Sequence, residues 1–139
     1  MTAKEYFERI KGIKLEIAKL DQRIREETDD LTAIGGFDYT RPVVQSSPHN
    51  AMEEKVIRLH TSIEKLIDLK NTWLREYEAA ERQLQKLSKA EYGQVIRLRY
   101  LTKIRRPKWG WVAEEMEISE VYARKIHQKA LEEFEQKFL

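Results

Sequence analysis

The sequence predicts an all-α protein: a long antiparallel helical hairpin of the coiled-coil type, followed by a small three-helix module that contains a helix-turn-helix. Apolar residues recur at alternating four- and three-residue spacing along two long stretches. Among 139 residues, 36% are charged and only 5 are Gly and 3 Pro, which is typical of helical chains. We therefore expect a hairpin arm over residues 1–87, with a loop at 35–50, and a helix-turn-helix module over residues 88–139.

The first helix of the arm is expected to begin almost at once, because Thr2 and Glu5 have the spacing of a capping box. Its apolar stripe consists of Tyr6, Ile10, Ile13, Ile17, Leu20, Ile24 and Leu31. Such a heptad stripe requires a partner helix. The stripe stops before a pair of glycines, the usual chemistry of a helix C-terminus, and residues 35–50 then contain two prolines and no helical period. A loop is predicted there.

The second helix of the arm is predicted to start at Asn50, with Glu53 completing a capping-box-like pair. Its stripe consists of Met52, Val56, Leu59, Ile63, Leu66, Trp73, Tyr77, Ala80, Leu84 and Leu87, with Lys70 as the one polar residue on it. The two stripes can pair within one chain or between two chains, and the sequence does not choose. Because one hairpin buries only a single seam, we expect self-association, with a dimer favoured.

The C-terminal module is expected to begin at Ser88, which has capping-box spacing to Glu91. The inward face of its first helix carries Val95, Leu98 and Leu101. Apolar residues of the next, short helix share one face: Trp109, Val112, Ala113 and Met116. Ser119 is a good N-cap for the last helix, over about residues 119–137. The inward face of that helix carries Ala123, Ile126, Ala130 and Phe134.

Two short helices joined by a tight turn, the second with basic groups on its exposed face, form the arrangement that places a recognition helix in the DNA major groove. The exposed face of this recognition helix is predicted to carry Glu120, Val121, Tyr122, Arg124, Lys125 and Gln128. Glu117 argues against this interpretation, because the turn requires a residue that tolerates positive φ. Pairs of amphipathic helices also occur in proteins that do not bind DNA.

Positive charge is concentrated in the C-terminal part of the chain. Residues 88–139 hold 11 Lys or Arg against 8 Asp or Glu, whereas residues 1–87 hold 15 against 16. Residues 92–113 contain no acid, and their basic residues are Arg97, Arg99, Lys103, Arg105, Arg106 and Lys108. Such a cluster beside a helix-turn-helix attracts a phosphate backbone and makes binding depend steeply on salt. The alternative is a solvated basic loop.

A set of residues in the chain also matches a known pattern: Trp109, Val112, Ala113, Glu114, Glu115, Met116, Ser119, the run 127–131, Arg99, Tyr100, Leu101 and the run 44–47. At these positions the chain resembles the ArpU/RinA-like phage late-transcription regulators, whose C-terminal end is similar to region four of sigma factors. The resemblance implies a sequence-specific DNA-binding regulator of phage or prophage late genes. Two positions depart from the pattern: Glu117, where relatives tend to have glycine, and Gly110, where a polar helix former is usual.

The resemblance and the charge pattern together assign roles to the candidate residues. Arg124 and Lys125 are expected to contact bases or phosphates, with Glu120, Val121, Tyr122 and Gln128 beside base edges. Arg105, Arg106 and Lys108 are expected to hold the DNA backbone. The expected partners are double-stranded DNA, RNA polymerase and a second copy of the chain. Two alternatives remain: a recognition subunit for phage DNA packaging, of the small-terminase type, and a coiled-coil interaction protein that docks on RNA polymerase without reading DNA.

Enzymatic activity is not expected. The chain has no cysteine, and its histidines, His49, His60 and His127, lack the spacing of a metal site. No glycine-rich phosphate loop follows a strand, so we expect no cofactor and no metal. The N-terminal residues mix charge throughout, which predicts neither a signal peptide nor a membrane span and favours the cytoplasm. The resemblance to phage regulators implies that this is the cytoplasm of a bacterial host cell.

Overall fold

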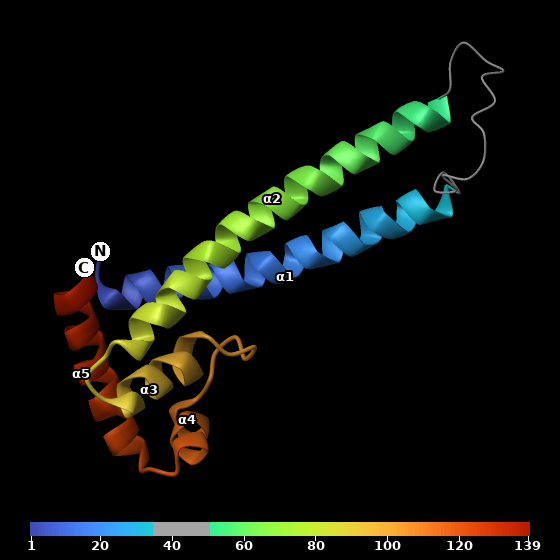
Figure 1. Cartoon of the computed structure of the whole chain (residues 1–139). Coiled ribbons are helices and arrows are strands. Elements are labelled where there is room, and N and C mark those ends of the chain that lie inside the picture. The colour runs from blue at the N-terminus through green and yellow to red at the C-terminus, as the bar shows by residue number, and fades with distance from the viewer. Residues whose placement is uncertain (35–50) are drawn as a thin grey trace. The chain divides into compact units, whose positions relative to one another are not determined.

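The structure, a computed structural model, describes residues 1–34 and 51–139. All regular elements of this described part are helices: α1 (Ala3–Ala33), α2 (Ala51–Gln85), α3 (Ala90–Tyr100), α4 (Trp109–Met116) and α5 (Glu120–Phe138) (Figure 1). The two long helices form an antiparallel pair, and the three shorter ones pack on one another. The predicted fold class is confirmed. The loop predicted at 35–50, with the cap at Asn50, lies outside the described residues.

Contacts divide the chain into two compact units. The first unit comprises Met1–Leu15 and Leu74–Leu139, so one end of each long helix packs with α3, α4 and α5. The second unit comprises Glu16–Trp73. Residue 88, where the sequence predicts a domain boundary, lies inside the first unit, and the division into an arm and a module stays a prediction.

The second unit holds the remaining length of the two long helices. Leu20 and Leu31 of α1 and Leu66 of α2 are buried, and all three belong to the predicted apolar stripes. Lys70, the polar residue on the second stripe, forms an ion pair of 2.6 Å with Asp21 across the helix pair. The polar interruption of the stripe is therefore matched by a charge on the facing helix.

The first turn of α1 has the predicted capping box. The backbone N–H of Thr2 donates to Glu5 Oε2 at 2.9 Å, and the backbone N–H of Glu5 donates to Thr2 Oγ1 at 3.2 Å. These bonds satisfy two of the N–H groups that a helix start leaves without a partner. The bond from the Thr2 N–H also lowers the pKa of the Glu5 carboxyl below its ordinary value.

The capping box predicted at Ser88 is wrong. The helix α3 begins at Ala90, and its N-cap is Lys89, whose side chain makes no capping bond. The backbone N–H of Ser88 instead donates to the Glu133 carboxylate of α5, at 3.1 Å to Oε1. Glu133 thus takes the place of Glu91 as the acceptor for this N–H, because α5 already positions the Glu133 carboxylate within hydrogen-bond distance.

The core of the first unit is built around Phe7, which the predicted stripe of α1 omits. The side chains of Phe7 and Phe134 are both 0% exposed. Tyr100 of α3 stacks on Phe7 with a ring-centroid distance of 5.7 Å. The N–H of Ala3 donates to Glu135 Oε1 at 2.8 Å, and the N and C marks accordingly lie side by side in Figure 1. The start of α1 and the end of α5 thus share one core.

Candidate nucleic-acid interface

The turn between α4 and α5 contains the positive-φ residue that the predicted helix-turn-helix requires. Glu117 has φ 56° and ψ 41°, which is the left-handed region. The N–H of Ile118 donates to Ala113 O at 3.0 Å, and the N–H of Glu117 donates to Glu114 O at 3.1 Å. This pair of bonds is the Schellman arrangement that ends a helix. The residue that argued against the turn therefore occupies its positive-φ position, at a conformational cost of about 1 kcal/mol.

The start of α5 is fixed immediately after this turn. The Ser119 side-chain oxygen accepts a hydrogen bond from the Tyr122 N–H at 3.1 Å, which confirms the predicted N-cap. The inward face is also confirmed, because its predicted members are all buried: Ala123, Ile126, Ala130 and Phe134. The direction and rotation of α5 are therefore set by a cap at one end and a buried stripe along one side.

The remaining face of α5 presents all six predicted recognition residues to solvent: Glu120, Val121, Tyr122, Arg124, Lys125 and Gln128. Val121 is 80% exposed, so its methyl groups face solvent. Arg124 forms an ion pair of 2.9 Å with Glu120, one helical turn earlier. Gln128 donates to Glu132 at 3.3 Å. Val121 and Lys125 make no side-chain hydrogen bond or ion pair within the described residues.

Tyr122 is tied to α3 rather than standing free. Its hydroxyl donates to Glu91, at 3.0 Å to Oε1 and 3.2 Å to Oε2. This hydrogen bond is the main cause that raises the pKa of the Tyr122 hydroxyl. The contact joins the first turn of the candidate recognition helix to the first turn of α3.

The ring of Trp109 lies near arginines of two helices, α3 and the candidate recognition helix α5. The guanidinium carbon of Arg99 is 4.7 Å from the centre of the indole ring, and that of Arg124 is 5.9 Å from it. Both distances are in the range of cation–π attraction. The side chain of Trp109 thus connects a predicted base-contacting arginine of α5 to an arginine of α3.

His127, on the inner side of α5, packs against the ring of Trp109. Its ring lies 4.9 Å from the Trp109 ring, and its Nε2 is 3.0 Å from the Tyr100 hydroxyl. Burial, with smaller effects of Arg99 and Lys4, lowers the pKa of His127 to about 4. The imidazole is therefore neutral near pH 7 and adds no positive charge to the interface. Burial also raises the pKa of Tyr100 to about 12.

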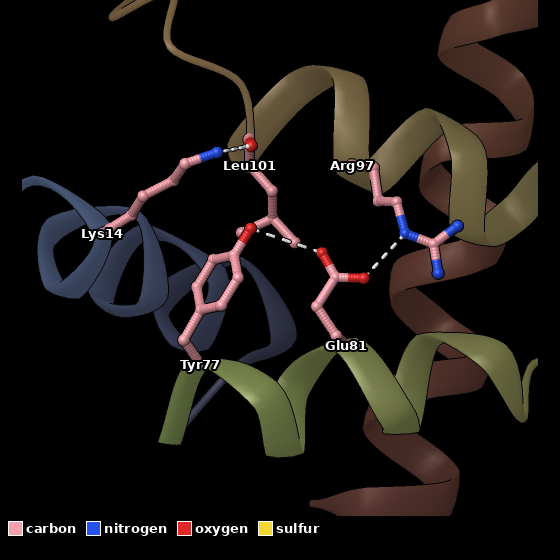
Figure 2. Close-up of polar contacts among 5 residues, drawn as sticks. All are labelled: Lys14, Tyr77, Glu81, Arg97 and Leu101. Carbon is pink, nitrogen blue, oxygen red and sulfur yellow. Dashed lines mark hydrogen bonds and ion pairs between the residues drawn. The ribbon is translucent and has the colours of Figure 1, made fainter. Parts of the chain in front are cut away.

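The six basic residues of the segment 92–113 do not act as one cluster. Arg97 donates through Nε to Glu81 of α2 at 2.9 Å, so its charge is matched inside the unit. Figure 2 shows this pair beside Tyr77, whose hydroxyl donates to the other oxygen of Glu81 at 3.4 Å. Lys14 of α1 donates to the backbone oxygen of Leu101 in the same view. Arg97 thus links α3 to α2, and Lys14 links α1 to the C-terminal end of α3.

The predicted backbone-contacting residues divide into two groups. Arg105 and Arg106 are exposed and line a pocket of about 430 Å³. Lys108 is exposed as well, but it is the N-cap residue of α4 and does not line the pocket. The other residues of the lining are Glu8, Lys11, Leu15, Arg99, Tyr100 and Pro107.

Sequence reasoning missed Lys11 entirely, and it noted Arg99 in the basic segment and in the family pattern but gave it no role in a site. Lys11 lies on α1, and its ammonium group donates to the backbone oxygen of Arg105, 94 residues later. Its position beside the apolar stripe of α1 is that of an ordinary solvated lysine, so no local signal marks it. Arg99 donates to the backbone oxygen of Pro107. Both side chains are positioned by carbonyl groups of the segment between α3 and α4.

Other kinds of site are not found in the part of the chain that the structure describes. That part contains no group of three or more His, Cys, Asp or Glu arranged to hold a metal ion. None of its helices is long and apolar enough to cross a membrane. Comparison with known proteins finds no family model, no curated protein and no solved structure that matches the chain. The family resemblance of the C-terminal part therefore stays a hypothesis.

Proposed function

We propose that this protein binds double-stranded DNA sequence-specifically and regulates transcription, with α5 in the major groove. The resemblance to phage late-transcription regulators implies that its targets are late genes of a phage or prophage. The observation that carries the proposal is the pairing of a helix-turn-helix geometry, with Glu117 at the positive-φ position, and an exposed face on the second helix.

The exposed face of α5 has side chains suited to base edges. Lys125 can donate to guanine, and the methyl groups of Val121 can contact a thymine methyl group. Arg124 is held by Glu120 at 2.9 Å in the free protein, and both side chains are at least half exposed. Exposed pairs of this kind contribute at most about 1 kcal/mol, so a guanine can replace the carboxylate as partner. Glu120 is then available to accept from a cytosine amino group.

The charge beside this face supports a phosphate contact. Arg105, Arg106 and Lys108 are exposed and make no ion pair within the described residues, whereas Arg97 is matched by Glu81. Unmatched positive side chains release counterions from DNA on binding and hold the backbone without specifying sequence. Of the six basic residues in the segment 92–113, we therefore favour Arg105, Arg106 and Lys108 as contacts to the DNA backbone.

A dimer is proposed as the binding form. Several large apolar side chains of α2 stay exposed within one chain, among them Met52, Ile57, Ile67 and Leu69. Covering such side chains favours association of two helices. Light scattering across a concentration series tests this proposal, and a two-fold symmetric operator is its expected counterpart in the DNA.

The function is tested by binding of the full-length protein to fragments of its own genome in competition with random duplex, repeated across a salt series. A fragment that survives competition is expected. Arg124→Ala should weaken binding to it by about 1–3 kcal/mol and relax the preference at one base pair. Arg106→Ala should weaken binding to all DNA sequences to the same extent.

The matched control is Lys19→Ala, which removes an exposed lysine of α1 that pairs with Glu16 at 3.4 Å in the second unit. It should leave both affinity and preference unchanged. Equal, weak binding of the wild type to every fragment would overturn the proposal. Co-purification with RNA polymerase in that case would favour the coiled-coil interaction protein instead.

A further inference from the structure

The pocket beside α3 brings together positive charges that are far apart in the sequence. Its cationic side chains are Lys11, Arg99, Arg105 and Arg106, and its single carboxylate is Glu8. The rest of its lining is formed by Leu15, Tyr100 and Pro107. All eight residues belong to one compact unit, so the pocket does not depend on the placement of the other unit.

Backbone oxygens orient two of the cationic side chains of this pocket, and the cationic side chains keep N–H groups that are free to donate to a ligand. Lys11 uses one of its three N–H bonds on the oxygen of Arg105, and Arg99 uses one of its five on the oxygen of Pro107. Neither Arg105 nor Arg106 makes a side-chain hydrogen bond or ion pair within the described residues. The pocket therefore offers several free N–H donors around a region with little negative charge.

The charges also act on one another. Burial, followed by the proximity of Arg99, Arg105 and Arg106, lowers the pKa of Lys11 below its ordinary value, and Glu8 offsets this only in part. Holding like charges this close is unfavourable in the free protein. A bound anion would relieve the repulsion, and a planar guanidinium matches the geometry of phosphate oxygens with two parallel hydrogen bonds.

We infer that this pocket is a phosphate-binding site in which Lys11 and Arg99 act together with Arg105 and Arg106. The phosphate belongs either to the DNA backbone or to a free phosphorylated small molecule. The first alternative rests on the proposed function. The volume of about 430 Å³ is within the range of small-molecule sites and accommodates more than one phosphate group. In either case the first helix of the chain contributes a ligand-contacting residue.

The test uses the full-length protein, its variants Lys11→Gln and Arg106→Gln, and the control Lys19→Gln. In the first arm, pyrophosphate is titrated at constant ionic strength while the melting temperature is recorded. We expect a saturable increase for the wild type and the control, and a smaller increase for both pocket variants. In the second arm, duplex binding is measured across a salt series. Each pocket variant should reduce the slope of log affinity against log salt by about 0.9.

If a phosphate of the DNA backbone occupies the pocket, the pocket variants should change the salt dependence measured in the second arm, and pyrophosphate should compete with duplex for the protein. A free ligand predicts changes in the first arm alone, with the salt slope of DNA binding unaltered. If the wild type does not bind duplex, the proposed function is contradicted. The pyrophosphate titration then still tests whether the pocket binds phosphate. Pocket variants that match the control in both arms overturn the inference. Lys11 also holds the segment between α3 and α4 through the Arg105 oxygen. Arg106→Gln removes no bond to the backbone, so this variant separates loss of a phosphate contact from loosening of that segment.

Discussion

The ring of Phe7 lies 4.6 Å from the ring of Phe134, centroid to centroid, and both side chains are fully buried. One comes from the second turn of α1 and the other from the last turns of α5. Edge contacts of tilted rings add to the stabilisation that burial gives. The packing of α3, α4 and α5 is therefore completed by a residue near the start of the sequence.

Phe7→Ala should lower the free energy of unfolding by about 3–5 kcal/mol, because it leaves a cavity among aromatic rings. Urea unfolding followed by circular dichroism measures this change. The matched control is Leu15→Ala on the same helix, whose side chain is 43% exposed and should cost much less. Equal losses for the two variants would contradict the packing of α1 against α5.

Glu117→Gly should raise the free energy of unfolding by about 0.5–1 kcal/mol, since glycine adopts the observed φ of 56° without steric cost. Glu117→Ala separates this effect from loss of the charge, and it should bring no comparable gain. Chemical unfolding of the three proteins at one pH gives the comparison. A larger gain for alanine than for glycine would assign the effect to charge and not to backbone conformation.

Two helical glycines should respond to alanine in opposite directions. A Cβ at Gly110 meets nothing within 4 Å, so Gly110→Ala should stabilise α4 by about 0.5–1 kcal/mol through its helix propensity. A Cβ at Gly93 would lie 3.2 Å from the backbone oxygen of Leu84. Gly93→Ala should therefore destabilise by about 1 kcal/mol or more, because α3 has to move away from α2. Melting temperatures of the two variants test the signs, and a gain at Gly93 would show that the helices separate easily.

Stability should fall as the pH is lowered from about 6.5 towards 4, because the pKa of His127 is reduced from 6.5 to about 4 in the folded protein. In that interval the unfolded chain binds a proton that the folded chain does not, so the stabilisation is complete above 6.5 and is lost towards 4. Allowing for partial exposure, the loss is about 2 kcal/mol.

Urea unfolding between pH 7 and 5, at constant ionic strength, measures this dependence. The Glu5 carboxyl contributes only at lower pH, because its pKa lies below the ordinary 4.5. His127→Gln should flatten the profile in this window while also lowering stability throughout, since the bond to Tyr100 changes. An unchanged slope in this variant would place the titrating group elsewhere.

Features that depend on neighbours in the sequence were predictable. The Ser119 cap, the buried face of α5 and most of the stripes of α1 and α2 follow from helical periodicity and short-range capping. The predicted stripes nevertheless omit the buried Phe7 and include Met52, which is 56% exposed. The capping box at Ser88 failed because Glu133, 45 residues away, accepts the same N–H. The contribution of Lys11 to the pocket was invisible for the same reason, since its partner oxygen lies 94 residues along the chain. The turn at Glu117 shows the opposite case, in which the hydrogen bonds of the turn overcome an unfavourable residue.

The contact between Phe7 and Phe134 also constrains how the chain folds. Helical proteins with mostly local contacts fold fast, whereas a contact that closes a long loop must first overcome the entropy of that loop. During synthesis on a ribosome, the long helices can form early, but Phe7 stays without its contact to Phe134 until α5 emerges. Until then the side of α1 that carries Phe7 and Ile10, both buried in the folded protein, stays exposed in the nascent chain.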